Sequence, residues 1–285
     1  MNITLVGSRY FGAAAFDALR SDATILQVAV PAPDDRLATA ANAAGASVCV
    51  LADARIVPGD AIPDGTDLIV AAHTHARVSD DALARSRLRG IGYHPSLLPR
   101  HRGIAAIEWT ILCGDPIAGG SVYHLEGGWD RGAIAAQDWC FVLAGETARG
   151  LWERALAPMG LALLSRVVRD ARDHGVVPSH PQDERFATKA PLIRVPIASS
   201  DERGDERGER VSLYLAAFGA DRVRLAELLS ERAQAFGANW NASRMMIAGN
   251  ETAAIVHVSV PTGDAEALVQ ALQGLESSGL RVARL

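Results

Sequence analysis

Short apolar runs alternate with helical segments through the first third of the chain, and this alternation limits the fold more than any other feature. Two segments with helical periodicity lie at residues 11–19 and 36–44. The apolar runs that predict strands lie at residues 2–7, 24–30, 47–51, 67–72 and 91–94. Strands that alternate with helices predict a mostly parallel sheet covered by helices, so we expect an α/β, Rossmann-like domain.

The next part of the chain extends this domain. We expect a helix at residues 104–112, strands at 121–125 and 133–142, and a long helix at 147–172 with Thr147 as its N-cap. Ligands of such sheets bind outside the carboxyl ends of the strands. The loops that follow Gly7, Ala72 and Tyr93 are therefore the expected places for a functional site.

A charged run without an apolar face, DERGDERGER, occupies residues 201–210. It predicts a linker at 196–209 between a catalytic domain at 1–195 and a second domain at 210–285. The second domain has the order βαββαβ, which is the ferredoxin-like arrangement, with a turn near Gly249 and Asn250. Its expected strands and helices lie at residues 211–217, 222–236, 241–248, 253–260, 264–275 and 280–285.

Composition excludes several classes of function. The net charge of −5 and the scattered arginines give no general attraction to nucleic acid. No apolar run reaches the roughly 18 residues that a membrane span needs, so we expect a cytoplasmic protein without a membrane partner. Cys49, Cys113 and Cys140 lack the spacing of metal ligands, and no GxGxxG motif points to a nicotinamide cofactor.

Two segments carry residues suited to catalysis. GIGYHPSLLPRHRG, at residues 90–103, places His94 at the end of a predicted strand, and LEGGWDRGAI, at 125–134, places Asp130 in a glycine-rich turn. Either residue alone is weak evidence, because histidines at strand ends are more often structural and aspartates are common in turns.

Together, the two segments resemble the folate-dependent formyltransferases and formyl hydrolases. The resemblance covers roughly residues 1–195 and includes the spacing of 36 residues between His94 and Asp130. Further matching positions are Gly7–Gly12, Ala106–Trp109, Gly114–Asp115 and Ala187–Thr188. Within the family, the chain is most similar to the hydrolase domain of 10-formyltetrahydrofolate dehydrogenase.

The resemblance implies 10-formyltetrahydrofolate as formyl donor and His94 and Asp130 as catalytic residues, with no metal. Formyl transfer passes through a tetrahedral oxyanion, whose charge the histidine can stabilise or to which it can supply a proton. The carboxylate orients the imidazole within hydrogen-bonding reach and can take a proton from the attacking water or amine. The implied folate contacts are Arg77, Val78, Ile91, Gly92, Tyr93, Glu126, Gly127 and Gly128.

Gly92 departs from the family pattern. Transferases of the family usually carry an asparagine there, and loss of an oxyanion-hole donor typically costs about 10²–10³ in rate. Gly92 therefore favours hydrolysis of the donor to tetrahydrofolate and formate, although it could also leave room for a bulkier substrate. Transfer of the formyl group to a small-molecule amine is the alternative, and a non-catalytic sensor of folate and an amino acid is a third.

Other polar residues have two interpretations. His73 and His75 could bind a metal. Histidines in such a loop more often line the folate pocket or are ordinary loop residues without a function. Arg100, His101 and Arg102 could contact an anionic substrate or simply form a solvated loop.

Residues 210–285 resemble an ACT domain, which implies a possible amino-acid effector and a homodimer. This tail is neither basic nor barrel-like, which argues against a tRNA substrate. The ligand loop of ACT domains usually reads DRPG, whereas here Asp221 is followed by Arg222, Val223 and Arg224. That difference argues against an effector and leaves dimerisation as the alternative role.

Overall fold

The computed structural model describes residues 1–126, 128–192, 210–219, 222–248, 251–275 and 281–284. Two compact units are present, and we describe each by itself. The first consists of residues 1–110 and 116–192, and the second is formed mainly by the C-terminal residues. The predicted linker at 196–209 lies outside the described residues.

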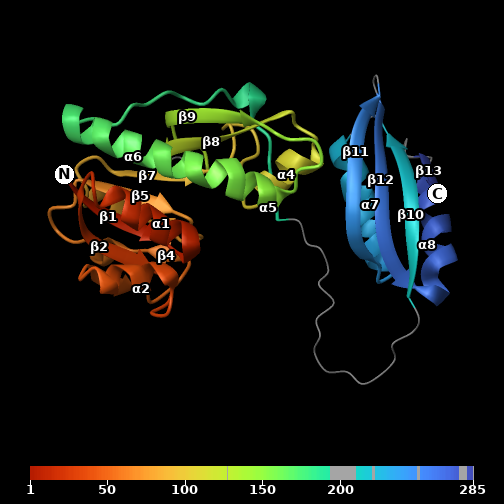
Figure 1. Ribbon diagram of the computed structural model, residues 1–285, viewed down its shortest axis with the longest axis horizontal. Helices are drawn as coiled ribbons and strands as arrows, with labels where there is room; N and C mark the ends of the chain where they lie inside the picture. Colours follow the sequence, from red (N-terminus) through yellow and green to blue (C-terminus); the bar gives the residue numbers. More distant parts are fainter. Residues whose placement is uncertain (127, 193–209, 220–221, 249–250, 276–280, 285) are drawn as a thin grey trace. The chain divides into compact units, whose positions relative to one another are not determined.

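A seven-stranded sheet forms the centre of the first unit (Figure 1). Counted in spatial order across the sheet, the first five strands pair in parallel, whereas the sixth and the seventh each pair antiparallel with the strand before them. This arrangement confirms the mostly parallel sheet. In spatial order the strands are β3 (Ser47–Val50), β2 (Thr24–Val30), β1 (Asn2–Gly7), β5 (Leu68–Ala72), β7 (Gly90–His94), β8 (Ile117–His124) and β9 (Ile134–Phe141).

Each central strand is buried on both faces. Ile3 and Leu5 point into a core shared with α1 (Arg9–Leu19), α2 (Arg36–Ala43) and α6 (Ala157–His174). Val6 points the other way, into a smaller core that also holds Val57 and Val78. Since successive side chains of a strand alternate between faces, this explains why the strands of the sequence are almost wholly apolar.

The second face is covered by short elements that the sequence patterns did not predict. β4 (Ile56–Val57) and β6 (Arg77–Val78) form a separate two-stranded sheet, and α3 (Asp80–Ala84) follows. A 3₁₀ turn spans Gly59–Ala61. The expected loop at Arg77 and Val78 is therefore a short strand.

The helices after residue 105 agree with the sequence prediction, except that the expected long helix is interrupted. α4 is Ala106–Leu112. The expected long helix is divided into α5 (Ala148–Leu151), a π-helical turn (Trp152–Leu156) and α6. Pro158 at the start of α6 has no backbone N–H, so the regular hydrogen-bond pattern changes there. Thr147 is confirmed as N-cap, since its hydroxyl accepts from the Gly150 N–H at 3.0 Å.

The second unit is a four-stranded antiparallel sheet with two helices. The strands lie in the order β11 (Asn239–Ala248), β12 (Glu251–Pro261), β10 (Arg210–Gly219) and β13 (Arg281–Arg284), and the helices are α7 (Arg222–Ala235) and α8 (Ala265–Gln273). The βαββαβ order agrees with the sequence prediction. The expected turn at Gly249 and Asn250, and Asp221 of the loop before α7, lie outside the described residues.

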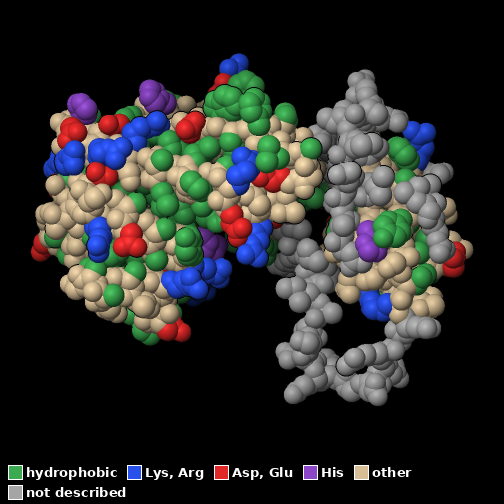
Figure 2. Space-filling model, viewed as in Figure 1, with side chains coloured by type: hydrophobic (Ala, Val, Ile, Leu, Met, Phe, Trp, Pro, Cys, Tyr) green, Lys and Arg blue, Asp and Glu red, His purple; other side chains and the backbone are tan. Residues whose placement is uncertain are grey.

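The surface of the first unit mixes the two signs of charge. On the face shown in Figure 2, basic and acidic side chains are interspersed. Exposed ion pairs of the first unit include Arg149–Glu153 and Arg172–Asp173. Within the described ranges, no helix has both the length and the apolar character to cross a bilayer.

Candidate functional site

His94 is the last residue of β7 and stands at the carboxyl end of the sheet, with only 7% of its surface exposed. Its Nε2 atom lies 2.8 Å from the backbone oxygen of His101. A carbonyl oxygen can only accept a hydrogen bond, so Nε2 carries the proton. In the neutral ring, the lone pair is then on Nδ1, which is the atom available for proton transfer.

Asp130 lies in the turn between β8 and β9 and is equally buried. Its φ of 56° is in the left-handed region, which aspartate tolerates better than most residues. Oδ1 accepts from the Tyr123 hydroxyl at 2.9 Å, and Oδ2 accepts from the Gly103 N–H at 2.8 Å. The carboxylate is therefore fixed by two donors that the sequence analysis did not identify.

The structure brings His94 and Asp130 together across the end of the sheet. His94 Nδ1 lies 3.6 Å from Asp130 Oδ1. This separation suits an ion pair but is longer than a hydrogen bond, so the expected direct hydrogen bond between the two is not present. The two groups are instead close neighbours without a hydrogen bond between them.

A segment at residues 178–191, which we call the strap, holds both the loop after His94 and the turn of Asp130. The Gln182 side-chain amide donates to the backbone oxygens of Asp130 (2.9 Å) and Gly132 (2.7 Å). Its Oε1 atom accepts from Arg102 at 2.6 Å. One glutamine thus ties the Asp130 turn to the loop that follows His94.

The strap also fixes His101, whose carbonyl binds His94. The Thr188 hydroxyl accepts from the His101 N–H at 2.8 Å, and the Thr188 carbonyl accepts from the Arg102 N–H at 2.9 Å. Partners so far apart in sequence leave no local pattern, although Thr188 belongs to the Ala187–Thr188 match with the family. The sequence therefore offered a signal for Thr188 and none for Gln182.

Arg102 is neither solvated nor open to a substrate, which corrects both interpretations of the basic cluster at this position. It is 9% exposed and pairs with Glu184 of the strap at 2.7 Å. Hydrogen bonding to Arg102 lowers the pKa of the Glu184 carboxyl. His101 is buried as well, whereas Arg100 is exposed.

Tyr123 is the cross-strand neighbour of Gly92 and lies on the same face of the sheet as His94. The two rings meet edge to face, with centroids 6.5 Å apart. Burial, followed by the charge of Asp130, raises the pKa of Tyr123 well above its usual range. The hydroxyl therefore keeps its proton and remains a hydrogen-bond donor.

Gly92 does not open additional space. A Cβ atom built there would lie 3.0 Å from Leu125 Cδ2 and 3.4 Å from Tyr123 Cε1. The space that a side chain would take is already filled, so the expectation of room for a bulkier substrate is wrong. The position provides neither a polar group nor a cavity.

The residues implied as folate contacts are divided between two faces of the sheet. Ile91 is fully buried in the core beneath α1 and α6, and the Tyr93 hydroxyl donates to the Leu156 carbonyl at 2.7 Å. Their side chains therefore point away from His94. Gly92 lies on the His94 face, and Glu126 and Gly128 are exposed in the turn that holds Asp130. Val78 is in the second core, Arg77 is exposed and pairs with Asp80 at 3.6 Å, and Gly127 lies outside the described residues.

His73 follows β5, the strand beside β7. The Ser8 hydroxyl donates to the His73 carbonyl at 2.7 Å and lies 3.1 Å from its Nδ1 atom. Burial, then the charges of His75 and Arg9, lowers the pKa of His73. Its ring meets that of His75 at 5.7 Å, and among the described residues no group of three metal-binding side chains occurs.

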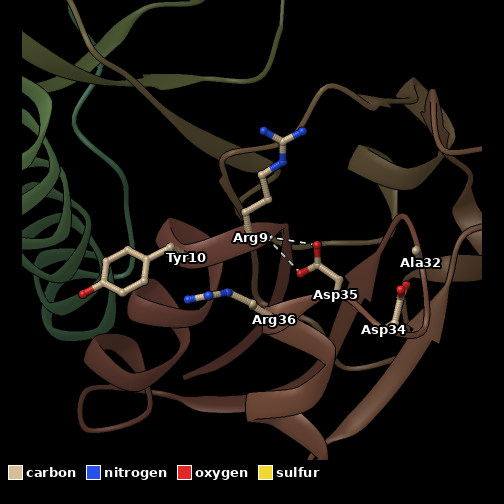
Figure 3. A pocket seen from close by; sticks show the side chains of 6 residues that line it. All are labelled: Arg9, Tyr10, Ala32, Asp34, Asp35 and Arg36. Atoms are coloured by element: carbon tan, nitrogen blue, oxygen red, sulfur yellow. Dashed lines mark hydrogen bonds between the residues drawn. The ribbon is translucent and has the colours of Figure 1, made fainter. Parts of the chain in front are cut away.

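An open pocket of about 430 Å³ lies at the ends of β1 and β2, and neither His94 nor Asp130 is among the residues that line it. Figure 3 shows the Asp35 carboxylate turned toward the backbone of Arg9, whose N–H donates to both oxygens at 2.9 and 3.1 Å. Asp35 also caps α2 by accepting from the Leu37 N–H. The remaining lining residues are Tyr10, Ala32, Asp34 and Arg36.

Comparison with known proteins identifies the family of the first unit. Residues 59–168 match the family model described as Formyl transferase. The chain carries a formyl transferase family domain. The family resemblance expected from the His94 and Asp130 motifs is thereby confirmed.

One relative and two solved structures show how far the similarity extends. The human mitochondrial 10-formyltetrahydrofolate dehydrogenase is 33% identical over 201 residues, which is 66% of this chain but only 22% of that protein. Phosphoribosylglycinamide formyltransferase from Bacillus halodurans has a TM-score of 0.53 at 17% identity, over 61% of this chain and 97% of the other. An N-formyltransferase from Helicobacter canadensis, in complex with folinic acid and dTDP-3-aminofucose, has a TM-score of 0.55 at 12% identity, over 90% and 98%. At such identities, the two structures show a shared fold.

Proposed function

We propose that the protein hydrolyses 10-formyltetrahydrofolate to tetrahydrofolate and formate, with His94 and Asp130 as the catalytic pair. The observation that carries this proposal is the convergence of two buried groups, Nδ1 and Oδ1, at 3.6 Å in a formyl transferase family domain. Both groups are held by fixed partners, as a preorganised site requires.

In this mechanism, a water molecule beside the pair attacks the formyl carbon and gives its proton to the pair. The resulting oxyanion is stabilised by a proton on His94 Nδ1, since Nε2 already donates to His101. Collapse of the intermediate breaks the bond between the formyl carbon and N10, and N10 takes the proton back from the pair. The products are formate and tetrahydrofolate.

Gly92 supports hydrolysis over transfer. Leu125 and Tyr123 fill the position, so it offers neither an amide donor nor space for a large acceptor. Water needs no such space. The similarity to 10-formyltetrahydrofolate dehydrogenase points the same way, although it covers only 22% of that protein.

N-formylation of a small-molecule amine is the second candidate. The same pair would accept a proton from an attacking amine, and the likeness in fold to N-formyltransferases supports this reading. An amine acceptor would enter beside Glu126 and Gly128, which are exposed in the turn next to Asp130.

In either reaction, we expect the folate to contact the turn at Glu126–Gly128 and the residues around Arg77 through backbone groups. We also propose that residues 210–285 form an ACT-like module that pairs two copies of the chain and has an amino acid as its possible effector. The antiparallel order β11-β12-β10-β13, with two helices, supports this proposal.

The deciding experiment is incubation of the purified protein with 10-formyltetrahydrofolate alone. Formation of tetrahydrofolate and formate in equal amounts is expected. If tetrahydrofolate forms only after an amine is added, the protein is a transferase. Folate binding without turnover under either condition, with an affinity that an amino acid changes, would instead identify a sensor.

A further inference from the structure

We propose that Tyr123 is a positioning residue that holds the Asp130 carboxylate in place and keeps Oδ1 apart from His94. This role rests on the proposed function of the His94–Asp130 pair. Tyr123 does not lie in either of the sequence motifs that identify the pair, and it acts on the reaction through Asp130.

The backbone explains how Tyr123 reaches this position. Tyr123 on β8 pairs with Gly92 on β7 in the antiparallel part of the sheet. Because Gly92 has no side chain, the Tyr123 ring can lie against β7, with Cε1 3.4 Å from where a Cβ atom would stand. That placement brings the hydroxyl to 2.9 Å from Asp130 Oδ1.

The hydrogen bond fixes the position of the carboxylate. Asp130 has one donor on each oxygen, the Tyr123 hydroxyl on Oδ1 and the Gly103 N–H on Oδ2. Burial raises the pKa of Tyr123, so its hydroxyl donates throughout the range in which enzymes work. Tyr123 is thus a permanent donor, unlike a water molecule that could leave.

The same bond keeps the catalytic pair open. Oδ1 is the oxygen that faces His94 Nδ1, and it lies 0.7 Å closer to the tyrosine hydroxyl (2.9 Å) than to Nδ1 (3.6 Å). Without Tyr123, Oδ1 would be free to close on a protonated His94. Such closure would occupy both groups and leave no place for the attacking water.

The other charged or titratable groups around Asp130 come from three elements. His94 faces it from β7, and the exposed Arg131 follows it in the turn. The Arg102–Glu184 pair is linked to its backbone through Gln182. All of these are retained when the Tyr123 hydroxyl is removed, so a substitution there isolates one interaction.

The test is the steady-state kinetics of formyl-folate hydrolysis by Tyr123→Phe. The ring that fills the space over Gly92 is kept, and only the donor is lost. We expect kcat to fall by about 10-fold, because Oδ1 loses its fixed position and a misplacement near 1 Å can cost up to about 10²-fold. The KM for the folate should stay within about twofold. An unchanged kcat, or a loss that lies wholly in KM, would overturn the proposal.

A measurement without substrate separates this proposal from the proposed function. In protein with ¹⁵N-labelled histidine, the ring-nitrogen signals of His94 at one fixed pH should change in Tyr123→Phe, because Oδ1 becomes free to approach Nδ1. The change should be absent when Tyr123→Phe is made in an Asp130→Asn background. Tyr214→Phe, which removes an exposed hydroxyl of β10, is the matched control and should leave the His94 signals unchanged.

The outcomes are distinguishable. If wild-type protein fails to hydrolyse or transfer the formyl group, the proposed function is wrong, yet the NMR signals of His94 still decide the role of Tyr123. If these signals are the same in Tyr123→Phe as in the wild type, Tyr123 does not act through Asp130.

Discussion

The carboxyl edge of the large sheet carries two regions that are built in different ways. Around His94, the polar groups are buried, and their partners come from distant segments: Tyr123 from β8, and Gln182 and Thr188 from the strap. Around Arg9, the pocket is open, and the Asp35 carboxylate accepts hydrogen bonds from backbone N–H groups at the starts of α1 and α2. Both regions are polar, so polarity alone does not distinguish a catalytic site from a structural one.

The difference lies in what the removal of one group would cost. A buried polar group that loses its partner carries its desolvation penalty, about 1–3 kcal/mol, whereas exposed pairs are worth about 0–1 kcal/mol. The region around His94 therefore depends on its buried hydrogen bonds for its geometry. Substitutions in the two regions can test this contrast when both enzyme activity and the free energy of unfolding are measured.

The largest effect is expected for Asp130→Asn. General acid–base catalysis contributes about 10²–10⁴ in rate, and kcat/KM for formyl-folate should fall by about that factor. Asparagine tolerates the φ of 56°, its oxygen can still accept from the Gly103 N–H, and its NH₂ group can donate to the Tyr123 hydroxyl oxygen, so the fold should survive. His94→Ala should cause a loss of similar size.

The matched control for Asp130→Asn is Asp35→Asn, the same change in the open pocket near Arg9. It should leave kcat/KM unchanged. Steady-state kinetics of the three variants check the prediction. Retention of most activity in Asp130→Asn or His94→Ala would remove these residues from the mechanism.

A smaller loss is expected for Gln182→Leu. The substitution removes the donor to the Asp130 and Gly132 carbonyls and the acceptor of Arg102, so the free energy of unfolding should fall by about 1–3 kcal/mol. Displacement of the Asp130 turn should also lower kcat by about 10–100-fold, since a misplacement near 1 Å can cost 10²-fold.

Gln27→Leu provides the comparison, because the Gln27 amide donates to the Ala61 carbonyl far from the catalytic pair. It should lose stability without losing activity. Urea unfolding and kinetics on both variants separate the two effects. Equal activity in Gln182→Leu and wild type would mean that the strap stabilises the fold without positioning the site.

The contrast also explains which features the sequence could reveal. The central strands were predicted because each is a continuous apolar run, such as residues 68–72, and burial on both faces requires nothing else. β4 and β6 have two residues each, too few for any period to appear. The break before α6 follows from Pro158, but a proline at a helix start and one after a π-helical turn look alike in sequence.

Of the proposed site, the sequence indicated only the two motif residues. His94 and Asp130 stand in segments whose residue pattern is distinctive, whereas Tyr123 and Gln182 reach Asp130 through tertiary contacts. Gln182 lies 52 residues from Asp130, and nothing in the intervening sequence indicates that they meet. Gly92 was recognised as a departure, but whether it made a cavity depended on Leu125 packing across the sheet.

In the open pocket near Arg9, Asp35→Ala should affect the stability of the fold alone. The side chain caps α2 and accepts from the Arg9 N–H, so its loss should cost about 1 kcal/mol, within the range of N-cap substitutions. Asp35→Asn keeps a capping oxygen and should lose less. Urea unfolding of both variants measures the difference, and a fall in kcat/KM in Asp35→Ala would mean that this pocket takes part in the reaction after all.

The smallest effect is expected at His73, which lies between the two regions. Burial lowers its pKa in the folded protein below the usual 6.5, so the unfolded chain binds a proton at higher pH than the folded chain does. The stability linked to His73 is therefore present above pH 6.5 and is lost as the pH falls through the folded value. His73→Asn accepts the φ of 58° and removes the titration. Between pH 8 and pH 5.5, the melting temperature of His73→Asn should drop less than that of the wild type. An equal drop in both proteins would show that the surroundings of His73 do not resist its protonation.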